Sequence, residues 1–279
     1  MSGPLIILLV VLFSMLLIGA PVIMAIGTAA MAYFFVAPGM VSELMMYAHR
    51  LFTGMDSFIY ICIPLFMLSG DLMGYIGLMD RVVDFCRLFV GRFRGGIAYV
   101  NVLASMMFGG ISGSAIADIA ALGPVEISMM TKDGYNKELS AALTATTSIQ
   151  GPVIPPSIPS VMFASLTSVS VGAMFIAGVI PGIMLGLGQI VVLYFMGKKY
   201  NFPKSDVRYA PKDAFKIILS SFSAIFMIIL ILGGIIGGIF TATEASAVSV
   251  LYALILGFLV YRNLTVKNLW EAVKHTATG

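Results

Sequence analysis

Two long stretches without a charged side chain limit what this chain can fold into. Residues 4–42 and 139–197 contain no Asp, Glu, Lys or Arg. At 1.5 Å rise per residue, the first stretch would form a helix of about 58 Å, nearly twice the ~30 Å hydrocarbon thickness of a bilayer. Only 10% of all residues are charged, whereas a soluble domain carries about 25%. The chain is therefore predicted to be an all-α integral membrane protein.

The apolar runs and their interruptions predict the membrane crossings. We expect residues 4–42 to cross twice and to fold back near Gly19-Ala20-Pro21, with one long tilted helix as the alternative. Residues 139–197 are long enough for two crossings divided near Ser168 to Gly172. Further spans are predicted over 57–76, 217–238 and 243–261, with polar stretches over 43–56, 132–138 and 198–216 and a basic tail from Arg262.

Residues 77–94 differ in character from the spans around them, because charged side chains interrupt an apolar background. The apolar residues recur at helical spacing, which predicts a helix lying along the membrane surface: Leu78, Val82, Phe85, Phe89 and Phe93.

Residues 95–131 are predicted to form a re-entrant helical hairpin. Residues 95–117 carry no charge, and 118–131 are apolar except for Asp118 and Glu126. A turn near Ser112 to Ser114 leaves about 16 or 17 residues in each leg, fewer than the ~20 required to span a bilayer. Ser112, Gly113 and Ser114 allow a tight reversal between them, with Ser114 as the N-cap of the returning helix. A seam of small residues between two ordinary helices is the alternative interpretation.

The basic residues predict which side of the membrane each loop faces. If 77–94 is cytoplasmic, all of the 16 Lys and Arg residues except Arg50 fall on the cytoplasmic side. Such a bias is the positive-inside pattern of multi-pass membrane proteins.

A cluster of prolines interrupts the apolar run after residue 139. Each proline removes a hydrogen bond to the carbonyl four residues earlier. Pro152, Pro155, Pro156 and Pro159 are therefore expected to free the carbonyls of Ser148, Gly151, Pro152 and Pro155. These oxygens would suit a sodium ion, and a helix restarting near Ser157 would offer N–H groups to an anion. A proline kink patched by neighbouring hydroxyls is the alternative.

The hairpin tip and the proline break are expected to form one site. From Gly96 to Ile111 is about 24 Å of helix, and from Glu138 to Gly151 about 20 Å. Since both segments start from the cytoplasmic face, tip and break should reach similar depth. Interrupted helices meeting in mid-membrane are typical of secondary transporters.

Three acidic residues remain to be assigned. Asp118 either balances an ion or complements the N-terminus of its own helix. Glu126 is expected near the cytoplasmic interface in a structural role. Glu244 follows Thr241 at the spacing of a capping box.

Several other functions find no support in the sequence. Gly110-Ile111-Ser112-Gly113 matches the GxSG pattern of intramembrane serine proteases, but neither His49 nor His275 lies in an apolar span where a catalytic base is needed. No enzyme activity is expected. Cys62 and Cys86 form no disulfide or zinc pattern, and basic residues are not interleaved with aromatics as nucleic-acid binding requires.

A weak internal repeat is also present. The pair of apolar segments in 4–42 resembles the pair in 217–261, and each is followed by an amphipathic stretch, 43–52 and 264–275. With the orientation above, the two pairs start on opposite sides of the membrane, as in inverted-repeat transporters.

Four motifs resemble the large permease subunit of TRAP (tripartite ATP-independent periplasmic) transporters: FGGISGSAIADIAALG, DGYNKELSAALTATTSIQGPVIPPSI, FIAGVIPG and GIFTATEASAV. The resemblance covers nearly the whole chain. It implies an elevator-type, sodium-coupled importer of an organic acid in the bacterial inner membrane. It also implies two partners, a small four-helix membrane subunit and a periplasmic binding protein that delivers the substrate.

The resemblance further implies that the tip and the broken helix build half of the ion and substrate site. The sodium ligands are then Ser112, Gly113, Ser148, Gly151, Pro152 and Pro155. The substrate would contact Ser114, Ala115, Pro156, Ser157 and Ile158, with sodium as coupling ion and no other cofactor.

Two departures from the family pattern stand out. Ala242 replaces the proline usual in GIFTPTEA, and the second hairpin and second broken helix of the family are not found before Gly279. We accordingly expect a fragment or a truncated product, with scaffold helices over 1–94, a mobile transport element over 95–170, and the start of a second repeat over 171–279. A non-transporting scaffold subunit and an ion channel are the alternative functions.

Overall fold

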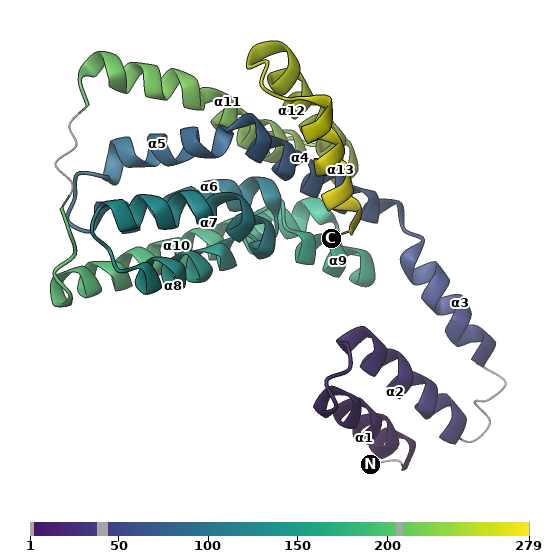
Figure 1. Ribbon diagram of the computed structural model, residues 1–279. Helices are drawn as coiled ribbons and strands as arrows, with labels where there is room; N and C mark the ends of the chain where they lie inside the picture. The colour runs from purple at the N-terminus through teal and green to yellow at the C-terminus, as the bar shows by residue number, and fades with distance from the viewer. Residues whose placement is uncertain (1–2, 38–43, 205–208, 279) are drawn as a thin grey trace. The chain divides into compact units, whose positions relative to one another are not determined.

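The computed structural model describes residues 3–37, 44–204 and 209–278, and these ranges are helical apart from turns, loops and one isolated bridge between Arg94 and Lys204 (Figure 1). The chain divides into two compact units, Met1–Ser57 and Phe58–Gly279. The predicted all-α class is confirmed.

The first unit contains the helices α1 (Gly3–Leu17), α2 (Val22–Val36) and α3 (Leu44–Met55). Gly19 has a φ of +85°, a left-handed conformation that glycine adopts without a steric penalty. The predicted turn near Gly19 is thus confirmed, and one continuous helix over 4–42 is wrong. The Tyr47 hydroxyl of α3 donates to the Gly27 carbonyl of α2 over 3.1 Å.

The second unit contains the remaining helices. They are η2 (Phe58–Ile61), α4 (Cys62–Ile76), α5 (Leu78–Val90), α6 (Gly96–Ser112), α7 (Ala115–Lys132), α8 (Lys137–Thr147), η3 (Ser148–Gln150), α9 (Ile158–Thr167), α10 (Val171–Lys199), α11 (Pro211–Ile236), α12 (Ala242–Ile255), the π-helical turn Leu256–Val260 and α13 (Val266–Thr278).

Four helical segments in the described ranges are long and apolar enough to cross a bilayer: Phe58–Ile76, Val171–Lys199, Pro211–Ile236 and Ala242–Val260. They match the predicted spans over 57–76, 217–238 and 243–261 and the second predicted crossing in 139–197, and Ser168, with a φ of +58°, ends α9 at the predicted division. The two helices in the described part of 4–42 have only 15 residues each and are not among the four. The helices α6, α8 and α9, of 17, 11 and 10 residues, are too short to cross alone. The predicted linker is shorter than expected, because α10 continues to Lys199 and α11 begins at Pro211.

Helix α6 lies at the centre of the second unit, packed between α5, α7, α8 and α10 (Figure 1). Its side chains are buried on nearly every face, including Ile97, Ala104 and Phe108. A helix that is apolar all round must be covered on all sides. The hairpin made by α6 and α7 is therefore the core around which the other helices pack.

Helix α5 buries one face against the protein and leaves two phenylalanines exposed. Leu78 and Val82 are buried, but Phe89 and Phe93 are about half exposed, at 53% and 52%. Met79, Val83 and Cys86 complete the buried face, which packs on α6 and α11. The predicted helix is confirmed over Leu78–Val90, and its position along the membrane surface stays a prediction.

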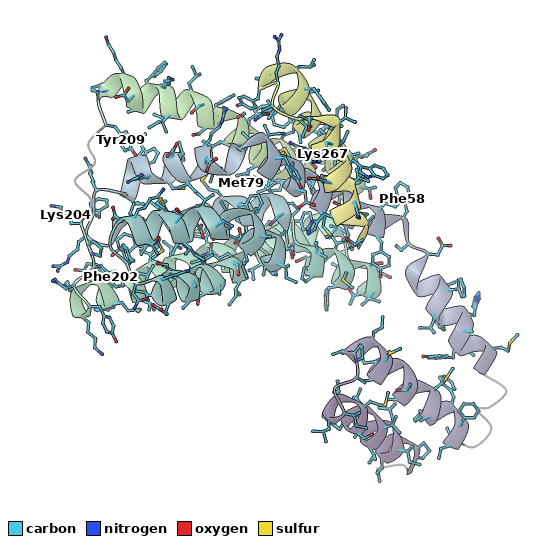
Figure 2. All side chains as sticks on the ribbon, in the orientation of Figure 1. Phe58, Met79, Phe202, Lys204, Tyr209 and Lys267 are labelled. Atoms are coloured by element: carbon cyan, nitrogen blue, oxygen red, sulfur yellow. The ribbon has the colours of Figure 1, made fainter. Side chains whose placement is uncertain are left out.

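The segment after α10 closes the base of the hairpin. Phe202 is buried and its ring lies 5.1 Å from that of Tyr135. The Gly95 N–H, at the start of α6, donates to the Pro203 carbonyl over 2.9 Å. Figure 2 shows Phe202 and Lys204 at the same end of this unit. Residues 202–204 thus connect α10 to the start of α6 and to the segment that follows α7.

We expect Phe202→Ala to lower the free energy of unfolding by about 3–5 kcal/mol, because it empties a filled space between α6, α10 and Tyr135. Thermal unfolding in detergent measures the change. The matched control is Phe195→Ala on α10, whose side chain is 64% exposed and which should change stability by less than about 1 kcal/mol. Equal effects of the two substitutions would contradict the packing role of Phe202.

Candidate functional site

The tip of the hairpin is a two-residue turn. Gly113 has a φ of +63°, and Ser114 caps α7 by accepting a hydrogen bond from the Ala117 N–H over 3.4 Å. Ser112 is fully buried, and its hydroxyl exchanges 3.4 Å hydrogen bonds with the backbone of Ser114. The predicted reversal and N-cap are confirmed.

The proline break spans residues 151–157, between η3 and α9. The N–H groups of Val153 and Ile154 both donate to the Gln150 carbonyl, at 3.0 and 2.8 Å, which makes a tight turn. Ser157 is buried and caps α9 by accepting from the Ser160 N–H over 3.3 Å. The sequence prediction of an interrupted helix restarting near Ser157 is confirmed.

The tip and the break are in direct contact. A Cβ built on Gly109 would lie 3.0 Å from the Gly151 Cα, and one built on Gly151 would lie 3.1 Å from the Ser114 carbonyl. The Ile158 N–H donates to the Gly113 carbonyl over 3.3 Å. Glycine at these positions lets the two backbones approach closely, because the contacts of an added Cβ would be tighter than nine in ten real Cβ contacts.

Two of the four carbonyls that were expected to be free are occupied. The Ser148 carbonyl accepts from the Gly151 N–H over 3.0 Å. The Pro152 carbonyl accepts a short hydrogen bond from the Ser157 hydroxyl. Among the described residues no hydrogen bond reaches the carbonyls of Gly151 and Pro155. The proposed sodium ligands therefore reduce, in this conformation, to Gly151 and Pro155 on the break.

The first turn of α9 offers no free N–H group, which corrects the second expectation. Ile158 donates to Gly113, Pro159 has no N–H, and Ser160 donates to the Ser157 hydroxyl. The Val161 N–H donates to the Ser157 carbonyl over 3.1 Å. Pro156, Ser157 and Ile158 thus join the tip to the break rather than presenting donors.

The first turn of α7, unlike that of α9, has backbone N–H groups without a hydrogen-bond acceptor in the described part of the chain. Within the described ranges no acceptor is found for the N–H groups of Ala115 and Ile116, and both lie next to the capping Ser114. Ile116 is 81% exposed. Of the two helix starts at this site, α7 is the one whose N–H groups are open to an anion.

A pair of glutamines beside the break was missed in the sequence. Gln150 is fully buried, and its side-chain Nε2 donates a short hydrogen bond to the side-chain Oε1 of Gln189 on α10. Gln189 in turn donates to the Thr146 carbonyl over 3.0 Å. The Gln150 Oε1 atom is buried and accepts no hydrogen bond. Two glutamines within charge-free helices were the available signal, because an amide in an apolar span must find a partner.

The acidic residues have different surroundings. Asp118 lies in the first turn of α7 and is buried, a position that fits the helix dipole, while a role with an ion stays a prediction. Glu126, expected near the interface, is fully buried within the protein. Glu244 and Thr241 form the predicted capping box, in which the Thr241 N–H donates to the Glu244 carboxylate over 2.8 Å.

Comparison with known proteins decides the family. Residues 9–279 match the family described as "Tripartite ATP-independent periplasmic transporter, DctM component". This chain belongs to that family. As the family is one of membrane transporters rather than proteases, the GxSG pattern of the tip is not a catalytic motif.

Several relatives carry named substrates. The chain is 39% identical over 232 residues to the sialic acid TRAP transporter large permease protein SiaM of Vibrio cholerae, covering 82% of this chain and 53% of the relative. It is 35% identical to the C4-dicarboxylate TRAP transporter large permease DctM of V. cholerae, covering 92% and 56%. It is 36% identical to the 2,3-diketo-L-gulonate TRAP transporter large permease YiaN of Escherichia coli, covering 83% and 54%. The chain thus spans about half the length of these relatives.

We expect Gly113→Ala to destabilise the chain by about 2 kcal/mol or more. The left-handed conformation costs an L-residue roughly 1–2 kcal/mol, and the added Cβ would overlap the Pro156 carbonyl oxygen. Thermal unfolding in detergent reports the loss.

The control is Gly188→Ala in the middle of α10, where a Cβ meets nothing within 4 Å. Removing a helical glycine there should leave stability unchanged or raise it by up to about 1 kcal/mol. A Gly113→Ala protein as stable as the control would show that tip and break do not pack as described.

Proposed function

We propose that this chain forms part of the large membrane subunit of a sodium-coupled secondary transporter that imports an organic acid. The observation that carries the proposal is the backbone contact between Gly113-Ser114 of the tip and Gly151 to Ile158 of the break. Two helix interruptions that meet in this way leave backbone dipoles in a protein-walled space, where an ion and a polar solute can bind.

Sodium would bind on the side of the break. The Gly151 and Pro155 carbonyls and the buried Gln150 Oε1 are neutral oxygen acceptors without a hydrogen-bond donor among the described residues. Ser112, whose hydroxyl bonds are long at 3.4 Å, could turn toward the ion. Hard cations prefer such oxygen ligands, and the Ser148 and Pro152 carbonyls would join only after their present hydrogen bonds open.

The acid would bind at the start of α7. The N–H groups of Ala115 and Ile116, the Ser114 cap and the positive end of the helix dipole favour a carboxylate there. The relatives named above are described as permeases for sialic acid, C4-dicarboxylates and 2,3-diketo-L-gulonate, all carboxylate compounds. An organic carboxylate is therefore the substrate class we propose.

Transport would occur by an elevator movement. Helices α6 and α7 would act as a re-entrant hairpin that carries the site, together with the broken segment α8, η3 and α9. The short helices support this proposal, because neither α8 nor α9 can cross a bilayer alone.

The working assembly would contain two further proteins in the bacterial inner membrane and periplasm. A small four-helix membrane subunit would stabilise the large one, and a periplasmic binding protein would deliver the acid. The family description names a tripartite system. Neither a scaffold subunit nor a channel would need a binding protein to deliver a substrate.

Uptake into proteoliposomes tests the proposal. The large subunit containing this sequence, reconstituted with its membrane partner, should accumulate a radiolabelled carboxylate only when the binding protein and an inward sodium gradient are both present. Potassium in place of sodium is the control. Conductance that does not saturate and needs no binding protein would indicate a channel, and no uptake of any tested acid would favour a scaffold role.

The paired substitution Ser112→Ala with Ser114→Ala should weaken the sodium dependence of that uptake, since it removes two oxygens and a helix cap beside the proposed ion. We expect the sodium concentration for half-maximal rate to rise several-fold. Ser14→Ala in α1, an exposed serine outside the tip, serves as the control. Unchanged sodium dependence in the paired variant would argue against the tip as an ion site.

A further inference from the structure

A second cluster of polar side chains lies inside the protein, away from the tip. It is formed where α6, α7 and α8 meet, and its members are all buried: Asn101, Ser105, Asp118, Glu126, Thr144 and Thr147. The amide and hydroxyl groups bond to one another. Asn101 donates to the Thr144 hydroxyl over 2.8 Å and accepts from the Thr147 hydroxyl over 2.7 Å.

The two carboxyl groups of this cluster have no partner. Neither oxygen of Asp118 or of Glu126 reaches hydrogen-bonding geometry with any described residue. The Ser105 hydroxyl lies beside both carboxyl groups, and the Thr144 hydroxyl lies beside Glu126. The ion pairs in the described ranges, Lys267 with Glu271 and His275 with Asp71, involve neither.

Two buried carboxylates without a counter-ion would be strongly unfavourable, because each would lose its hydration and repel the other. Taking up a proton removes both costs and supplies a donor. Thr144 already accepts from Asn101, so its own proton is free to point at Glu126. A protonated Glu126 can in turn donate to the Ser105 hydroxyl.

Among the described residues, the other ionisable groups next to this part of α7 supply no positive charge to compensate the two carboxyl groups. From α5, the Cys86 thiol faces Glu126. From α4, Asp71 and Tyr75 border the other side of α7, beside Ala117 and Ala120.

A polar cavity of about 580 Å³ lies between α5 and the second half of α7. Its wall includes the neighbours of Glu126 on α7, namely Pro124, Val125 and Ser128. The charged groups that line it are Asp80, Asp84, Arg87, Lys132 and Asp133. Pro124 has no N–H, so the α7 hydrogen-bond ladder is open at this point. Glu126 itself does not line the cavity and is fully buried, so these neighbours separate its carboxyl group from the cavity.

We infer that Glu126, in the same buried cluster as Asp118 and flanked by Ser105 and Thr144, is a proton-binding site that is occupied at neutral pH and exchanges with water. The site is separate from the proposed sodium site, since neither Glu126 nor the two flanking hydroxyls belong to the tip or the break. It holds whether or not the chain transports an acid.

Infrared spectroscopy of the purified chain in lipid nanodiscs tests this site directly. At pH 7 the wild-type spectrum should show the C=O stretching band of a protonated carboxylic acid, and the band should shift in D₂O. Glu126→Gln should weaken the band, Asp118→Asn should leave the Glu126 component in place, and the double variant should abolish the band, because both buried carboxyl groups can carry a proton. Glu138→Gln, at an exposed position on α8, should leave it unchanged.

Absence of the band from the wild-type spectrum at pH 7 would overturn the inference without relying on any variant. So would a band that is unchanged in Glu126→Gln, or one that fails to shift in D₂O. Spectra in sodium chloride and in choline chloride should be the same; a band that appears only in choline would mean that the carboxyl pair holds sodium instead of a proton.

Discussion

The structure depends on one constraint: a backbone that leaves the helical pattern inside an apolar protein must find new partners for its polar groups. The chain meets this constraint by placing two interruptions against each other. The Ser157 hydroxyl covers one carbonyl of the break, the Ile158 N–H covers a carbonyl of the tip, and glycines let the backbones touch. What these contacts leave uncovered, chiefly the Gly151 and Pro155 carbonyls, is then available for binding.

Sequence patterns predicted the features that depend on local chemistry. Helix lengths follow from apolar runs, the turn at Gly19 follows from the Gly19-Ala20-Pro21 segment, and the cap at Ser114 follows from a serine before a helix. The Thr241–Glu244 capping box is of the same kind. Each requires only residues within a few positions of one another, so the sequence alone contains the information.

Features that depend on distant residues were harder to predict. Counting prolines correctly located the break but overstated the free carbonyls, because a serine five residues away occupies the one at Pro152. The α9 N–H groups were expected to be open, yet one is taken by Gly113 from another helix. The buried face of α5 and the burial of Glu126 likewise follow from which helices surround them, and a single sequence does not state that.

Two attachments join α10 to the hairpin region, and they lie far apart along that helix. One is the glutamine pair beside the break, and the other is the segment from Phe202 to Lys204 at the foot of α6. A helix that is attached at two separated points cannot rotate about either of them. In the elevator movement proposed above, a displacement of α6 and α7 would therefore carry α10 with it.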